Sequence, residues 1–336
     1  MRLLPARITI CLVLLAISAS AAGPVKLIFD TDMGNDVDDA LALALIHEFA
    51  DRGEAELLAV TLSKDNLWAA AYTDAVNTFY GRPDIPIGIV KGGKTPDDGK
   101  FVRAISERKA DGKLVYPRDI GPDLKSDLPD ATDLLRTTLA AQQDGAVTLV
   151  SVGFLTNVAR LLQSKPDANS PLNGTDLAKA KVNIYIAMAG AFSGVRQPEY
   201  NVFIDAEASR YVFANWPTPL VASGFEIGLA IFYPAISIER DYAYVPDHPV
   251  AEAYRLYDAM PHDRPTWDLT AVLYAVRSEH GYFDLSYPGR ISLNAKNVTE
   301  FAEGGGAAQR YLVASPEQVT TVRELFVHLV SSPPEK

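Results

Sequence analysis

Cysteine is almost absent from this chain of 336 residues, which contains one, Cys11. Cys11 lies in segment 1–22, where Arg2 and Arg7 precede an apolar run and then a row of small residues. This order is typical of a secretory signal peptide, and the apolar run is too short for a finished membrane-spanning helix. We therefore expect cleavage to leave residues 23–336 in the periplasm or outside the cell, without stable membrane anchoring. Such a protein has no disulfide and no thiolate, so any metal ion needs oxygen or imidazole ligands.

Positive charge is also scarce. Lys and Arg together number 31 against 42 Asp and Glu, and the formal net charge is −11. Loss of segment 1–22 removes two arginines and no acids, which leaves 29 basic and 42 acidic residues and a net charge of −13. A protein this acidic repels the phosphates of nucleic acids and anionic lipids. We therefore expect no nucleic-acid partner; the charge is compatible with cation binding, or with solubility alone.

Long apolar stretches, repeats and Gly/Ser-rich linkers are absent after residue 22, which favours one domain over 23–336. Short apolar runs rich in β-branched residues alternate instead with segments of helical composition. This alternation predicts an α/β fold with a mostly parallel central sheet and helices on both faces, as in a Rossmann-like core. The expected strands are 25–29, 57–62, 85–90, 147–152, 182–187 and 219–222, and the expected helices include 40–50, 69–80, 131–143 and 155–163.

Polar segments follow four of the expected strands. Residues 30–39 follow the first strand, 63–66 the second, 153–157 the fourth, and 198–201 come after the fifth. Sheets of this kind bind ligands beyond the carboxyl ends of their strands. We therefore expect these four segments to meet at one rim of the sheet and to form a site there.

The first of these segments is strongly acidic. It carries five carboxylates within ten residues, at Asp30, Asp32, Asp36, Asp38 and Asp39. In a partly buried loop these groups repel one another unless protons or a cation compensate them. Helix capping explains one or two of them, but not five. A site with many oxygen ligands and no thiolate favours Ca²⁺ or Mg²⁺, and a flexible set of oxygen ligands favours Ca²⁺. The spacing of these aspartates is not that of an EF-hand loop, so distant residues would have to complete the site.

Four motifs occur in order along the chain. They are the aspartate-rich segment 26–43, Gly-Phe-Leu-Thr-Asn at 153–157, Pro-Glu-Tyr-Asn at 198–201 with Asp205, and the pair Trp-Asp at 267–268. Together they resemble the motifs of the inosine-uridine-preferring nucleoside hydrolase family. The resemblance spans nearly all of the chain after residue 22, and it implies a nucleoside hydrolase-like fold and an N-glycosidase that hydrolyses ribonucleosides to ribose and free base. A nucleoside partner and, by analogy, a homo-oligomer are also implied.

The resemblance implies a calcium site. Its ligands would be Asp32, Asp39, Asp268 and the backbone carbonyl of Thr156, with Asp32 also acting as the general base. A bound cation lowers the pKa of its water, and a neighbouring carboxylate can then accept the proton. Asp30 is expected to orient the loop.

The resemblance also implies how substrate is bound. Asp38, Glu199 and Asn201 would bind the ribose hydroxyls.

Many members place a His that protonates the leaving base before the last calcium-binding Asp, but this chain has Trp267, which cannot donate that proton at neutral pH. A tryptophan here resembles the purine-preferring branch, where the indole stacks on the base and an aspartate, matched by Asp65, lies nearby. We therefore expect purine ribonucleosides as substrates and catalytic roles for Trp267 and Asp65; a packing role is the alternative for Trp267. Candidates for the base's other face are Tyr72, Tyr80 and Tyr116.

Two departures from the family pattern leave alternatives open. Asp36 inherits no role and could be a further ligand. Segment 191–197 lacks the asparagine that commonly holds the sugar 5′-OH, for which Ser193 or Arg196 could substitute.

A secreted calcium-dependent nucleoside- or sugar-binding protein without turnover is one rival function. A haloacid dehalogenase-type phosphatase is another, because Asp30 to Asp32 also match the start of its motif, although Gly34 does not fit.

Overall fold

A computed structural model describes residues 23–124, 127–194, 197–306 and 308–335. The expected signal peptide at 1–22 and Arg196 lie outside the described residues. Among the helices of the described part, none is both long enough and apolar enough to cross a bilayer.

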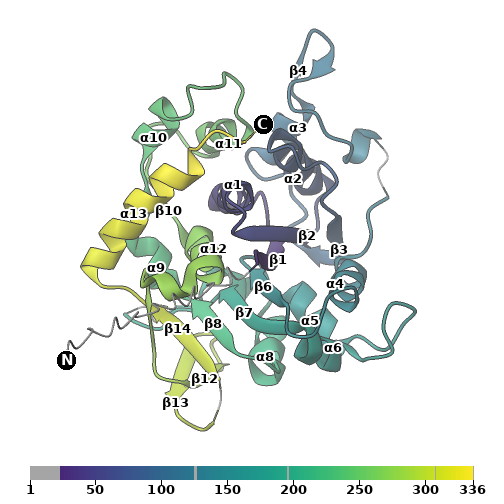
Figure 1. Ribbon diagram of the computed structural model, residues 1–336, viewed down its shortest axis with the longest axis vertical. Helices are drawn as coiled ribbons and strands as arrows, with labels where there is room; N and C mark the ends of the chain where they lie inside the picture. The colour runs from purple at the N-terminus through teal and green to yellow at the C-terminus, as the bar shows by residue number, and fades with distance from the viewer. Residues whose placement is uncertain (1–22, 125–126, 195–196, 307, 336) are drawn as a thin grey trace, which may run out of the picture.

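A ten-stranded sheet runs through the molecule (Figure 1). Seven neighbouring strands are parallel, and antiparallel strands extend the sheet at one end. All six strands expected from the sequence belong to the parallel part, which confirms the mostly parallel α/β fold. In spatial order the strands are β13 (Thr299–Glu303), β12 (Gly289–Leu293), β14 (Gln309–Val313), β8 (Leu220–Ser223), β7 (Val182–Met188), β6 (Val147–Ser151), β1 (Val25–Thr31), β2 (Ala55–Lys64) and β3 (Ile87–Lys94), with β11 (Asp284–Leu285) paired to β14.

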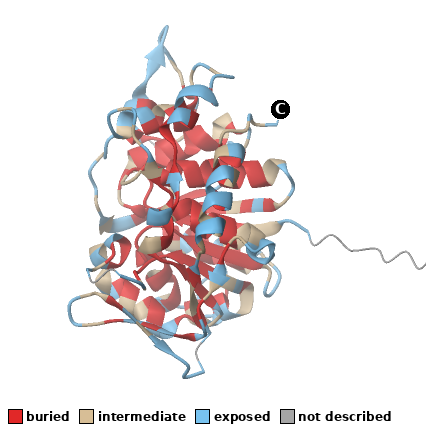
Figure 2. Ribbon diagram, turned by 90° about the vertical axis from the view of Figure 1, so that its left-hand side faces the viewer, coloured by how far each residue is buried: buried red, intermediate tan, exposed pale blue. Residues whose placement is uncertain are grey.

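Helices cover both faces of the sheet and enclose two hydrophobic cores. Alternate residues of β1 point to opposite faces, so Leu27 and Phe29 enter one core while Ile28 enters the other. Figure 2 shows that buried residues fill the centre of the molecule. The first core is covered by α1 (Asp38–Asp51), α2 (Leu67–Phe79), α3 (Val102–Glu107), α11 (Pro249–Tyr257), α12 (Trp267–Arg277) and α13 (Pro316–Val330), and the second by α4 (Ala131–Ala140), α5 (Thr156–Gln163), α6 (Gly174–Lys181) and α8 (Ala206–Asn215).

The remaining elements are short. The helices are α7 (Tyr200–Ile204), α9 (Phe225–Ala230), α10 (Ala235–Arg240) and the 3-10 turns Pro122–Leu124 and Ser278–His280. Two small antiparallel sheets of two strands pair β9 (Phe232–Tyr233) with β10 (Arg264–Pro265) and β4 (Lys109–Ala110) with β5 (Lys113–Leu114).

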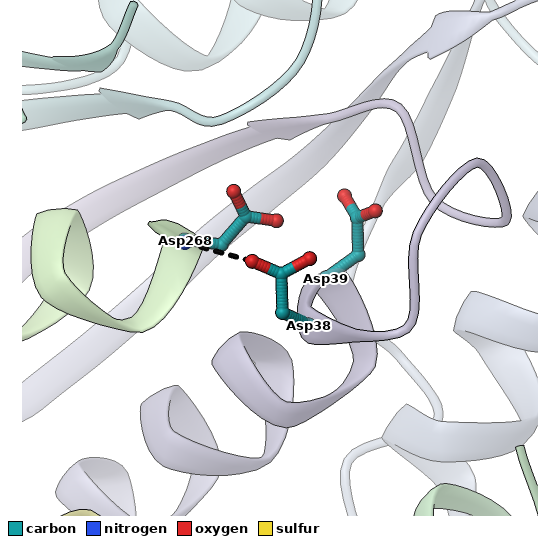
Figure 3. A group of neighbouring side chains, drawn as sticks. All are labelled: Asp38, Asp39 and Asp268. Carbon is teal, nitrogen blue, oxygen red and sulfur yellow. Dashed lines mark hydrogen bonds between the residues drawn. The ribbon is translucent and has the colours of Figure 1, made fainter. Parts of the chain in front are cut away.

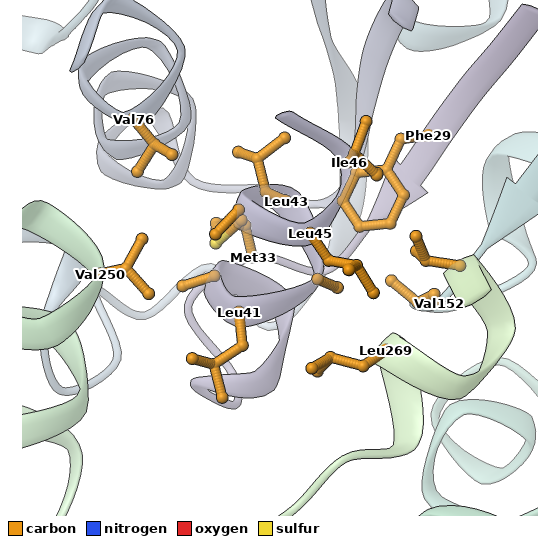
Figure 4. Close-up of a cluster of buried hydrophobic side chains, with 14 of the residues drawn as sticks. Phe29, Met33, Leu41, Leu43, Leu45, Ile46, Val76, Val152, Val250 and Leu269 are labelled. Carbon is orange, nitrogen blue, oxygen red and sulfur yellow. The ribbon is translucent and has the colours of Figure 1, made fainter. Parts of the chain in front are cut away.

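Helix α1 is buried on all sides. Every residue from Asp38 to Phe49 is buried, because α1 contacts α2, α11, α12, α13 and β2. Figure 4 shows its leucines among side chains of these neighbours, including Val76, Val250 and Leu269. A helix that is apolar on every side belongs in the interior of a protein. This packing fixes the first turn of α1, with its two aspartates, at the rim of the sheet.

Candidate active site

A cavity of about 370 Å³ opens beside the carboxyl ends of β1, β6 and β7. Its volume is in the usual range for small-molecule sites. The cavity contains seven residues that the sequence analysis assigned to the site and excludes two, Asp65 and Thr156. It is lined by Asp32, Asn35, Asp36, Asp38, Asp39, Val152, Met188, Glu199, Tyr200, Asn201, Phe225, Tyr257, Arg264, Trp267 and Asp268.

Three buried carboxylates meet in this cavity. Asp38 and Asp39 come from the first turn of α1 and Asp268 from the first turn of α12 (Figure 3), and one oxygen of each lies within 4.8 Å of the others. The backbone N–H of Asp268 donates to Asp38 Oδ2 at 3.1 Å, and the Thr31 hydroxyl donates to Asp39 Oδ1. Asp39 Oδ2 is buried and has no hydrogen-bond partner among the described residues.

This cluster is electrostatically unfavourable without a cation. Burial raises the pKa of Asp38, Asp39 and Asp268 well above the ordinary value, and the neighbouring carboxylates raise it further. The cluster offers hard oxygen donors and an unpaired buried carboxylate oxygen, so these residues fit a divalent metal ion. Asp39 and Asp268 were expected in such a group from the sequence, whereas Asp38 was expected to bind ribose.

Asp32 is held by a chain of hydrogen bonds that the sequence analysis missed. Asn35 Nδ2 donates to Asp32 Oδ2 at 2.7 Å, and Lys64 Nζ donates to Asn35 Oδ1 at 2.7 Å. Lys64 is fully buried and also donates to the Thr95 carbonyl at 2.8 Å. Burial raises the pKa of Asp32 to about 6, while the Asn35 hydrogen bond and the Lys64 charge oppose the rise. The polar Lys-Asp-Asn after the second strand was the only sequence signal for this lysine.

The floor of the site depends on Gly153. A Cβ atom at this position would lie 2.8 Å from Asp32 Cβ, so any larger residue would displace Asp32.

Asp30 is held by two hydrogen bonds nearby: its Oδ1 accepts from Asn157 Nδ2 at 2.7 Å and from Thr61 Oγ1 at 2.6 Å. These contacts join the first strand to its neighbours and agree with an orienting role for Asp30.

Glu199 and Asn201 line the cavity and join the loops after β6 and β7. Glu199 caps α7, and its oxygens accept from the backbone N–H groups of Asn201 at 2.9 Å and of Gly190 and Val202 at 3.1 Å. Asn201 Nδ2 donates to the Val152 carbonyl at 2.7 Å. Burial raises the pKa of Glu199 to about 7 against these hydrogen bonds.

The structure does not bring Thr156, an expected calcium ligand, into this cavity. Thr156 is the first residue of α5, so its carbonyl points along the helix, and its hydroxyl donates to Asp205 Oδ2 at 2.6 Å. The residue of this segment that reaches the cavity is Val152, directly after β6. Strand β6 ends at Ser151, one residue before the end of the strand expected from the sequence, so Val152 lies just beyond the strand end, where ligands bind.

The structure also leaves Asp65, which was expected beside the base, outside this cavity. Asp65 Oδ2 accepts the backbone N–H of Gly93 at 2.9 Å and so joins β2 to the β3 segment, outside the cavity lining. The register between β2 and β3 shifts between Leu62 and Lys64. Such a shift changes which side chains face a site, and here the buried Lys64 approaches Asn35 instead.

Trp267 lines the cavity as expected and also packs. Its ring stacks on Phe225 with centroids 5.5 Å apart, and its Nε1 donates to the Phe225 carbonyl at 2.8 Å. Phe225, Tyr200 and Tyr257 are the aromatic residues that share the cavity with it. The tyrosines proposed for the opposite face of the base are wrong, because all three are buried outside this cavity lining: Tyr72, Tyr80 and Tyr116.

Asp36 does not belong to the carboxylate cluster. It forms an ion pair with Arg264, whose Nε donates to Asp36 Oδ1 at 2.9 Å. Arg264 is the only Lys, Arg or His among the described residues that line the cavity. No sequence pattern pointed to this pair, because its members are 228 positions apart.

Buried carboxylates beside aromatic residues, at the strand ends of a parallel sheet, suit a glycosidase, an enzyme that separates a sugar from its substituent. Residues 27–324 match the model of the family described as inosine-uridine preferring nucleoside hydrolase, and the chain belongs to that family. The phosphatase alternative is therefore wrong. The chain is a nucleoside hydrolase that cleaves the N-glycosidic bond of ribonucleosides.

Individual relatives differ in the base they are named for. The chain is 27% identical over 319 residues to an uncharacterized protein, C1683.06c, of Schizosaccharomyces pombe, covering 89% of this chain and 94% of that one. It is 29% identical over 219 residues to the pyrimidine-specific ribonucleoside hydrolase RihA of Salmonella agona, over 64% of this chain and 65% of RihA. The solved structure of a purine-preferring ribonucleoside hydrolase from Gardnerella vaginalis has the same fold, with a TM-score of 0.69, 16% identity and coverage of 91% of this chain and 98% of that one. Family membership therefore leaves the base preference open.

Proposed function

We propose that the protein is a calcium-dependent hydrolase of purine ribonucleosides that acts outside the cytoplasm. The observation that carries this proposal is that one cavity gathers buried carboxylates and the stacked rings of Trp267 and Phe225. The carboxylates suit a cation and a ribose, and the rings suit a flat base. Export rests on the signal-peptide interpretation of 1–22, and mass spectrometry of the N-terminus of the exported protein tests it.

The proposed reaction uses the chain's own residues for proton transfer and charge stabilisation. Asp32 accepts the proton of the attacking water, and Asn35 and Lys64 fix the orientation of its carboxylate. The sugar acquires oxocarbenium character as its bond to the base breaks, and the surrounding carboxylates stabilise that charge. Asp38, Glu199 and Asn201 are proposed to bind the ribose hydroxyls. When bound by Asp32, Asp38, Asp39 and Asp268, a calcium ion would neutralise their charges and polarise water and ribose oxygens.

A direct assay tests the proposal. Purified protein of residues 23–336 is incubated with inosine, adenosine, guanosine and uridine, with and without chelator, and released ribose is measured as reducing sugar. Ribose should appear faster from the purine nucleosides, and only without chelator. A folded, calcium-loaded protein that binds these nucleosides but releases no ribose would instead be the binding protein without turnover.

Replacing Trp267 by alanine should reduce the preference for purines. Stacking of an aromatic ring on a base is worth about 1–3 kcal/mol, so kcat/KM for inosine should fall by roughly 5- to 150-fold. The loss for uridine should be smaller, because its single ring offers less area to the indole. Trp267→Phe keeps an aromatic ring and serves as the matched control. Equal losses for inosine and uridine in Trp267→Ala would refute the stacking assignment.

Replacing Lys64 by methionine should lower kcat and leave KM nearly unchanged. Methionine fills a similar volume but gives Asn35 Oδ1 no donor, so Asn35 no longer holds Asp32 in place. We expect a loss of about 10-fold, equivalent to about 1.4 kcal/mol of transition-state stabilisation. Asn35→Ala should cause a similar loss, and the double variant should lose little more. A lower melting temperature with unchanged kcat would show that Lys64 only supports the fold.

A further inference from the structure

Among the described residues that line the cavity, none is a histidine that could donate a proton to the departing base. When the bond between C1′ and the base breaks, the bonding electron pair stays on the base nitrogen, which must be protonated or stabilised as an anion. Trp267 has its single indole N–H engaged with the Phe225 carbonyl at 2.8 Å. No histidine or lysine is among the described residues that line the cavity.

Arg264 is the cation that lies where the base would bind. Its guanidinium lies 5.3 Å from the ring centroid of Trp267 and 4.8 Å from that of Tyr257, so it belongs to the aromatic side of the cavity. Asp36 accepts hydrogen bonds from Nε and Nη2, and Nη2 also donates to the Tyr257 hydroxyl at 3.0 Å. Nη1 has no hydrogen-bond partner among the described residues, so the anchored guanidinium keeps two N–H donors for a ligand.

We propose that Arg264 stabilises the departing base, an inference that rests on the proposed nucleoside hydrolase function. Water oxygen forms a bond to C1′, its proton goes to Asp32, and the electron pair of the C1′–N bond passes to the base. Nη1 of Arg264 donates a hydrogen bond to a carbonyl oxygen or ring nitrogen of the base and so stabilises the anion that leaves. Arginine keeps its own proton, because it is not deprotonated in proteins, and solvent protonates the base afterwards. Asp36 is the positioning residue that holds the guanidinium.

The dependence of rate on the leaving group tests this role. Wild type and Arg264→Gln are compared on inosine and on 4-nitrophenyl β-D-ribofuranoside, whose phenolate leaves readily without stabilisation. The variant should lose kcat for inosine by roughly 10²- to 10³-fold, the usual cost of removing one donor to a developing anion. The loss on the nitrophenyl riboside should be only a few-fold, and Arg264→Lys should regain part of the rate on inosine.

Further variants separate this role from structural effects. Arg264→Gln leaves Asp36 without its ion pair, so the Asp36→Asn/Arg264→Gln double variant should show the same dependence on the leaving group. Arg240→Gln changes an exposed arginine on α10, outside the cavity, and should leave both rates unchanged.

Each other outcome has a defined meaning. Equal losses on both substrates would overturn the inference and make Arg264 a residue that only shapes the cavity, and an unchanged rate on inosine would exclude it from the reaction. A wild-type protein that cleaves the nitrophenyl riboside but no nucleoside would overturn the Arg264 role while leaving the glycosidase chemistry standing. A wild-type protein that cleaves neither compound would refute the proposed function itself.

Discussion

Replacing Asp32 by asparagine should abolish most turnover, with kcat/KM for inosine reduced by roughly 10²- to 10⁴-fold, the usual contribution of a positioned acid or base. Asp32 lies at the end of β1 in the cavity lining, and its Oδ2 accepts from Asn35 at 2.7 Å. Burial raises its pKa to about 6, close to the pH at which a general base works well. Asparagine has nearly the same shape but cannot accept the proton of the attacking water. Steady-state rates of ribose release measure the effect.

Controls for this variant come from the same loops. Asp65→Asn changes an aspartate outside the cavity and keeps an oxygen that can accept the Gly93 N–H, so its activity should stay within a few-fold of wild type. Without metal, the melting temperature of Asp32→Asn should not fall below that of the metal-free wild type, because the substitution removes a buried negative charge. Retained turnover in Asp32→Asn would refute the general-base role. A large loss in Asp65→Asn would show that our exclusion of Asp65 from the site is wrong.

Removing divalent metal should stop the reaction and destabilise the fold. Three buried carboxylates meet within 4.8 Å, and a ligand that binds only the folded state stabilises it by about 2.7 kcal/mol at 100 times its Kd. Dialysis against chelator should therefore lower the melting temperature and abolish ribose release, and added CaCl₂ should restore both. Elemental analysis should find one calcium per chain, and Asp39→Asn should lose that ion. Full activity after exhaustive chelation would refute metal dependence, and restoration by another divalent ion but not by calcium would refute the choice of calcium.

The stabilisation by calcium should grow with pH. Burial raises the pKa of Asp32 to about 6 and of Asp30 and Glu199 to about 7, against ordinary values of 3.8 for Asp and 4.5 for Glu. Without metal, the folded state therefore binds more protons than the unfolded state between about pH 4 and pH 7, and its stability falls as pH rises through this window. Calcium replaces protons on Asp38, Asp39 and Asp268, whose pKa burial also raises. The rise in melting temperature that calcium causes should therefore be larger at pH 7.5 than at pH 5. A gain that is equal at both pH values would contradict this linkage.

The general plan of the molecule was predictable because its signals are local. Six of the seven parallel strands are short apolar runs, since they are buried on both faces, and each is followed by a helix, so these six were found from composition alone. Strands β11 to β14 were missed, because their residues alternate or are partly exposed and give no continuous apolar run. The acidic segment and the Glu-Tyr-Asn segment were placed at one rim by the strand-end rule, whereas the Trp-Asp pair was added by the family resemblance.

The sequence by itself determined the fold class, the reaction class and the acidic and aromatic residues that the cavity would gather, since residue type and order carry that information. Only the tertiary structure decided which group of each segment reaches the cavity: Val152 rather than Thr156, and Lys64 approaching Asn35 while Asp65 turns to Gly93. It also paired Asp36 with Arg264, 228 positions later. The physical reason is that a local pattern encodes burial and periodicity. The direction of a side chain or carbonyl at a strand end depends on register shifts, helix starts and partners brought close by the packing of distant segments.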